Sequence, residues 1–157
     1  MTNWKEVDAK IAFAVANSVL RDSFEKGYTV CPMKLQKMIY FTYKKYLEDT
    51  GRVLFREQFQ AWDHGPVLRT VYDKFKRFRA NFIEQEKLED DGPFIPAKER
   101  EFYSALGYVS GVYHDYSGVG LSEITHRDGT AWKMAIDRED RILSVEDIER
   151  EEWLTQA

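Results

Sequence analysis

The chain of 157 residues carries a formal net charge of −4, with 43% hydrophobic and 15% aromatic residues. This length and apolar content suit one domain with its own core and exclude a disordered tail, and the acidic balance argues against a protein that binds nucleic acid over its whole surface. Its single cysteine, Cys31, excludes an internal disulfide framework and a zinc cage of thiolates. The charged N-terminal segment is unlike a secretory signal and no apolar run is long enough to span a membrane, so we expect a cytoplasmic protein.

Two helices are predicted in the first third of the chain. Residues 7–24 are apolar on nearly all sides, which is typical of a central, buried helix, and Gly27 is its expected stop. The second helix is expected to begin at Pro32, because proline suits a first helical turn, and to end at Gly51.

The polar residues of the second helix fall into two groups. Lys37, Lys44 and Glu48 form a narrow polar stripe, whereas Gln36 projects from an otherwise apolar flank. A buried amide without a partner costs about 1–3 kcal/mol. We therefore expect Gln36 to hydrogen-bond the backbone of a nearby loop, in preference to contacting a ligand.

The remainder of the chain is predicted to be helical with one exception. Alternating apolar and polar residues favour a short strand near residues 58–63, and Pro66 is expected to open an amphipathic helix. Further helices are predicted at 97–113, after the cap Thr130, and at about 144–154, where a charged helix follows Ser144. The fold class is thus mainly α, a single compact helical domain over residues 1–157 with a minor short β element near residues 58–63.

Basic residues gather in one segment despite the acidic total. Between residues 66 and 82 there are five of them against one acid. Their helical spacing among apolar residues favours the solvated face of an amphipathic helix, and a small nucleic-acid-binding regulator remains an alternative. The five are Arg69, Lys74, Lys76, Arg77 and Arg79.

The residues that carry chemistry form no motif of a known catalytic type. His64, His114 and His126 lack the spacing of a metal site, and a scattered site of two histidines with a carboxylate is the weaker alternative. Asp63 and His64 lie in "AWDHGPV", where Gly65 and Pro66 indicate a turn, so we interpret this stretch as a structural corner. We expect the His64 side chain to hydrogen-bond this corner and not to transfer a proton. We expect no catalytic residue, no cofactor and no bound metal.

Three segments together, "PMKLQKMIYF", "FQAWDHGPVLRTVY" and "LSEITHRDGTAW", carry a family resemblance. In this order and spacing the chain resembles the Panacea domain, the SocA-like or GepA-like phage-associated family. The matching positions, which we expect to be mostly structural, are Leu35, Gln36, Lys37, Tyr40, Trp62, Gly65, Pro66, Tyr72, Thr125, His126 and Trp132.

The resemblance implies the antitoxin of a toxin–antitoxin module, often carried on a prophage, that neutralises a cognate toxin by direct protein–protein binding. An alternative within the family is a proteolytic adaptor that delivers the toxin to a Clp-type protease. The resemblance supplies no catalytic residues. Aromatic and basic side chains are the usual anchors of protein interfaces, and the candidate partner-binding residues are Tyr40, Phe41, Arg69, Lys76 and Trp153.

Overall fold

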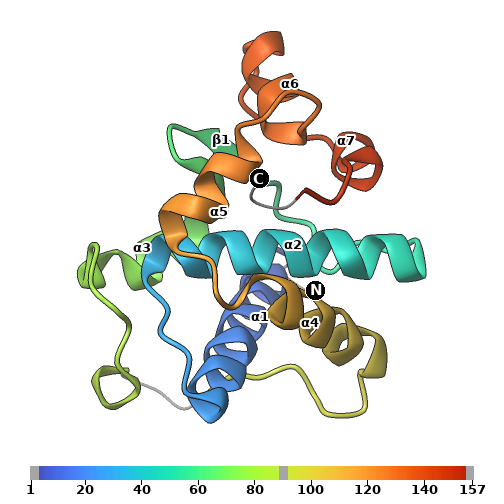
Figure 1. Cartoon of the computed structure of the whole chain (residues 1–157). Helices are drawn as coiled ribbons and strands as arrows, with labels where there is room; N and C mark the ends of the chain where they lie inside the picture. Colours follow the sequence, from blue (N-terminus) through green and yellow to red (C-terminus); the bar gives the residue numbers. More distant parts are fainter. Residues whose placement is uncertain (1–3, 89–91, 155–157) are drawn as a thin grey trace.

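The computed structural model describes residues 4–88 and 92–154, which form a mainly helical domain with one small antiparallel sheet (Figure 1). The predicted fold class is confirmed. None of the helices within these ranges is long and apolar enough to cross a membrane. The elements are α1 (Trp4–Lys26), α2 (Pro32–Thr50), β1 (Gln60–Trp62), β2 (Gly65–Val67), α3 (Arg69–Phe75), α4 (Arg100–Tyr113), α5 (Gly118–Thr125), α6 (Ala131–Arg138) and α7 (Val145–Arg150).

Helix α2 lies at the centre of the fold. Figure 1 shows it crossing the middle of the molecule, with α1 and α4 on one side and β1, α5, α6 and α7 on the other. Its bounds are those predicted, because Pro32 occupies the first turn and Gly51 ends the helix in a left-handed conformation with φ 70°. The amide of Gly51 closes the last turn by donating to the Leu47 carbonyl (2.8 Å).

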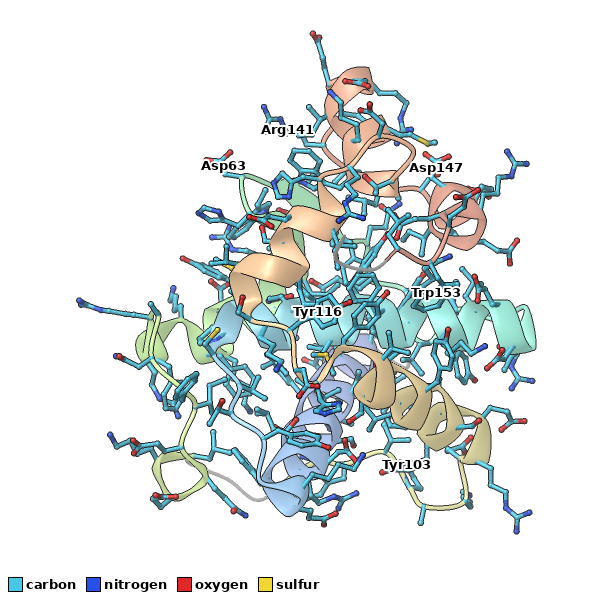
Figure 2. All side chains as sticks on the ribbon, in the orientation of Figure 1. Asp63, Tyr103, Tyr116, Arg141, Asp147 and Trp153 are labelled. Carbon is cyan, nitrogen blue, oxygen red and sulfur yellow. The ribbon has the colours of Figure 1, made fainter. Side chains whose placement is uncertain are left out.

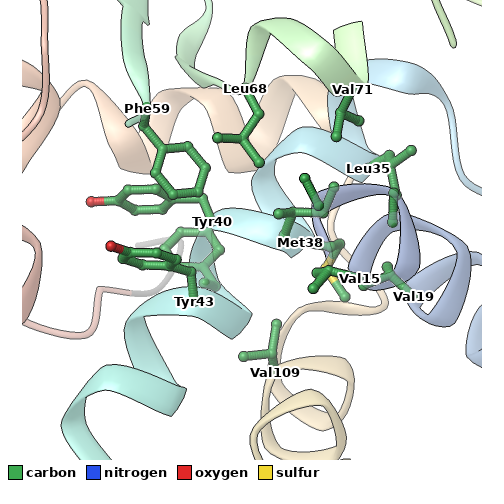
Figure 3. Packing of buried hydrophobic residues seen from close by; sticks show 14 of the residues in the cluster. Val15, Val19, Leu35, Met38, Tyr40, Tyr43, Phe59, Leu68, Val71 and Val109 are labelled. Atoms are coloured by element: carbon green, nitrogen blue, oxygen red, sulfur yellow. The ribbon is translucent and has the colours of Figure 1, made fainter. Parts of the chain in front are cut away.

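The hydrophobic core is assembled around α2 (Figure 3). Val15 and Val19 of α1 pack on one side of it, and Phe59 packs edge-on against Tyr40 and Tyr43 with ring centroids 5.1 and 5.2 Å away. The predicted apolar character of the first helix is explained by this arrangement, since α1 contacts both α2 and α3.

Two of the three residues in the polar stripe predicted on α2 are enclosed by the protein, whereas Glu48 is exposed. Lys37 and Lys44 are both buried, because α5 packs over the first half of α2 and α7 over the second. Lys44 Nζ donates to the Ile148 carbonyl and to Glu48 Oε1, both at 2.9 Å. These contacts tie α7 to the central helix.

The start of the third helix differs from its prediction. Pro66 lies in strand β2, where Ala61 is its partner in the antiparallel pair, and α3 begins only at Arg69. The reason is tertiary: Leu68 is held in an extended conformation because its backbone hydrogen-bonds the side chain of Gln36. The minor β element predicted near residues 58–63 is therefore the first strand of a hairpin.

The C-terminal helix is shorter than predicted. Ser144 caps it as expected, because its Oγ accepts a hydrogen bond from the Asp147 amide, and α7 ends at Arg150. The chain then turns inward at Glu151, whose carboxylate accepts from the Tyr40 hydroxyl (2.9 Å) and the Ala131 amide (2.8 Å). Burial raises the pKa of Glu151, and these two hydrogen bonds oppose the shift.

Residues 151–154 form an extended segment that covers the core beside α2. Trp153 Nε1 donates to Glu48 Oε2 (2.9 Å), and the indole packs against Phe41. The Tyr113 hydroxyl donates to the Leu154 carbonyl (2.8 Å). Figure 2 shows Trp153 next to α2, so this segment docks on the central helix.

Replacing Glu151 with alanine should destabilise the protein by about 2–4 kcal/mol, because two buried donors lose their acceptor. Glu151→Gln keeps one acceptor oxygen and should lose less than half as much. Urea unfolding followed by circular dichroism measures both free energies. Equal midpoints for the wild type and Glu151→Ala would show that this carboxylate does not hold the segment.

Candidate functional site

The three motif segments meet where the hairpin packs against α2 and α5. Gln36 is the first link: its Nε2 donates to the Leu68 carbonyl (3.1 Å) and its Oε1 accepts from the Leu68 amide (3.0 Å). The side-chain amide of Gln36 thus pairs with both backbone polar groups of Leu68, as a neighbouring strand would. The predicted structural role of Gln36 is confirmed by this pair of bonds.

Lys37 is a buried amine on the same turn of α2. Its Nζ donates to the Pro66 carbonyl (3.2 Å), and the residue is 1% exposed. Burial lowers the pKa of Lys37 from 10.5 to about 7, and the electrostatic effect of the nearby Cys31 opposes this only in part. Burial therefore favours the neutral form of this amine over the charged one.

Gly65 is required at the point where β2 crosses α2 and α5. Its φ of 113° disfavours any residue with a side chain. A Cβ at this position would also lie 2.5 Å from Thr125 Oγ1 and 2.6 Å from Lys37 Cε. Gly65 therefore packs directly against two other motif residues, Lys37 and Thr125.

The corner at residues 62–64 is fixed through its backbone. The backbone carbonyl oxygens of residues 62, 63 and 64 each contact a polar side chain from α6, from His126 after α5, or from α5. The side chains of Asp63 and His64 stay exposed. The ring of His126 also packs on Trp132 with centroids 3.9 Å apart. Trp132 Nε1 donates to Trp62 (2.7 Å), Ser122 Oγ donates to His64 (2.7 Å), and His126 Nε2 lies 2.6 Å from the oxygen of Asp63.

The structure thus accounts for "AWDHGPV" as a corner held by its neighbours. We expected the His64 side chain itself to hydrogen-bond the corner, whereas the backbone carbonyl of His64 makes that bond. Within residues 4–88 and 92–154, no three His, Cys, Asp or Glu side chains gather as a metal site would require.

The candidate partner-binding residues do not form one surface. Tyr40 and Phe41 lie in the core, at 0% and 2% exposure, because the C-terminal segment covers them. Arg69 and Lys76 are exposed on and after α3, and both reach Asp73 at 3.4 Å. Trp153 is half-buried beside α2.

An open pocket that the sequence did not reveal lies beside the motif residues. It has a volume of about 810 Å³ and is mainly apolar. We call it the motif pocket, because α2, the hairpin and α3 all contribute to it. Its lining includes Gln36, Lys37, Trp62, Tyr72, Arg79 and Arg141.

Comparison with known proteins gives one family. A family model described as "Antitoxin SocA-like, Panacea domain" matches residues 35–133, a span that includes every motif position from Leu35 to Trp132. Antitoxin SocA from Caulobacter vibrioides (strain NA1000 / CB15N) is 28% identical over 134 residues, which cover 82% of this chain and 70% of that protein. No significant match to a solved structure was found.

Substitutions of Gly65 and His64 test whether this corner has a structural role or a chemical one. Gly65→Ala should destabilise the fold by about 2–4 kcal/mol, through backbone strain and overlap with Thr125 and Lys37. His64→Ala should change stability by less than about 0.5 kcal/mol, since that side chain is exposed. Chemical denaturation of the two variants measures this, and a reversed order would contradict the packing described here.

The buried amine of Lys37 should give stability a pH dependence. Between pH 7 and about 10 the unfolded chain binds the proton more tightly than the folded one, so stability should rise with pH over this window, by at most about 1.4 kcal/mol per pH unit. Lys37→Met removes the titrating group and should flatten that rise. Parallel slopes for wild type and variant, in denaturant melts across the window, would contradict the burial of Lys37.

Proposed function

Because this chain belongs to the SocA-like, Panacea-domain family of antitoxins, we propose that it neutralises one cognate toxin by binding it directly. The binding would be stoichiometric and would require no catalysis by this chain. Family membership carries the antitoxin role. The direct mode of action is inferred from the geometry of the motif residues and of the surface beside them.

The motif residues support this proposal through what they are bonded to. Gln36, Lys37 and His126 all contact backbone carbonyls of the chain itself, so their polar groups are used for the fold. A protein that blocks its partner needs a rigid scaffold and a surface with apolar anchors. The motif pocket, framed by these residues and open to solvent, is the observation that carries the proposal.

The basic segment at residues 69–79 favours the protein-binding function over nucleic-acid binding. Asp73 accepts from both Arg69 and Lys76, and Arg77 donates to the carbonyls of Lys74 and Lys87. These three basic side chains therefore already have partners within the chain, as expected for the solvated face of a helix. Beside them lies a mainly apolar hollow, which suits a protein partner better than a phosphate backbone.

Co-expression with the products of neighbouring genes tests the proposal. One of them should inhibit growth when expressed alone, and this chain should restore growth and co-purify with it in a fixed ratio. The Lys98→Ala variant should restore growth equally well, because this exposed side chain lies outside the motif pocket.

The fate of the toxin distinguishes blocking from delivery to a protease. In cells that lack Clp proteases, growth should still be restored and the toxin should stay at full level. Loss of rescue in those cells would assign the adaptor function instead, and failure of every neighbouring product to be rescued would contradict the antitoxin function.

A further inference from the structure

The motif pocket opens beside a second hollow. This second pocket, of about 690 Å³, lies between the loop after α1, the segment after α3 and the start of α5. Met33 and Arg79 line both pockets, so the two meet around the first turn of α2. We call the combined surface the docking groove.

We infer that the docking groove binds an apolar segment of the toxin that carries carboxylate groups. This inference rests on the proposed function and names the surface and the chemistry through which it acts. Two adjoining pockets suit a stretch of polypeptide with at least two anchoring side chains.

Three of the seven exposed large apolar side chains among the described residues line the groove. Phe82 and Val119 are 58% and 63% exposed, the largest fractions among the large apolar side chains that the structure describes, and both line the second pocket. Tyr72, 39% exposed, lines the motif pocket. Apolar side chains gathered around a hollow mark an interaction site, whereas single exposed ones do not.

The charged side chains around the groove indicate that its partner carries carboxylates. Three basic side chains, Lys34, Arg79 and Arg141, line it against two carboxylates, in a chain whose net charge is −4. A locally positive groove on an acidic protein favours a partner segment with carboxylates, since complementary charge raises the association rate and selects the partner. The two carboxylates are Asp63 and Asp115, and Asp115 already contacts His114 Nε2 (3.0 Å).

Two of these cations keep donors available. With the residues that the structure describes, the side chains of Arg79 and Arg141 make no hydrogen bond or ion pair. Each guanidinium group has five donors. Carboxylate oxygens on a bound segment would satisfy them.

The backbone at both arginines is strained. Arg79 and Arg141 have φ of 54° and 61°, in the left-handed region that residues with a side chain rarely adopt. Such conformations cost about 1–3 kcal/mol and concentrate at binding and active sites. Two of the three described non-glycine residues with positive φ therefore line the same groove.

Binding measurements with the neighbouring-gene toxin that this chain rescues test the inference. Phe82→Glu, Val119→Glu and Tyr72→Glu should each weaken binding at least about tenfold, which is about 1.4 kcal/mol. Met134→Glu is the matched control, because Met134 is 38% exposed and lines neither pocket, and it should bind within about twofold of wild type.

Charge reversal tests the carboxylates separately. The double variant Arg79→Glu/Arg141→Glu should lose at least about tenfold in affinity and most of the salt dependence of binding, whereas Lys98→Glu/Arg100→Glu, at exposed positions away from the groove, should change neither by more than about twofold. Thermal unfolding of each variant confirms that it is folded.

A photo-crosslinking residue at position 82 or 119 identifies the bound segment directly. The linked toxin peptide should contain apolar residues and at least one Asp or Glu. A basic peptide, or wild-type affinity in all the groove variants, would overturn the inference while leaving the proposed function intact. Binding of a second copy of this chain in the groove, seen as self-association lost in the same variants, would overturn it too, and a wild type that binds no toxin would contradict the proposed function itself.

Discussion

The enclosure of α2 is the constraint on which the rest of the structure depends. The buried part of a helix must give every polar side chain a partner, since an unpaired buried group costs about 1–3 kcal/mol. Gln36 bonds Leu68, Lys44 bonds Ile148, and Tyr40 bonds Glu151. Each of these three residues therefore helps to determine where a different later segment lies, and the motif pocket is a consequence of where the hairpin and α3 are held.

The local features of the fold could be predicted from the sequence because they depend on local chemistry. Pro32 and Gly51 bound α2 as expected, and Thr130 and Ser144 cap α6 and α7 through their hydroxyl oxygens. The structural role of Gln36 was also predictable, because an amide on an apolar flank has to be paired. These are the positions where one residue type and its immediate neighbours decide the outcome.

The remaining features depend on contacts between distant segments. Pro66 suits a first helical turn, but the pairing of β1 with β2 and the bonds from Gln36 keep it in a strand. Tyr40 and Phe41 suit an interface by type, yet the segment at 151–154 buries them. The docking groove combines residues from four separated regions, so no single stretch of sequence could have indicated it, although Trp62 and Tyr72 were already marked by the family motif.

We propose that the shared motif residues serve the scaffold and that the groove beside them recognises the toxin. Hydrogen–deuterium exchange of the free and toxin-bound protein tests that assignment most directly, because it locates the contact surface without altering a residue. Exchange should slow in residues 32–37, 60–67 and 71–82, which line the groove, and should be unchanged in residues 100–110 of α4. Protection confined to α4, α6 or α7, with no change around the groove, would contradict the account.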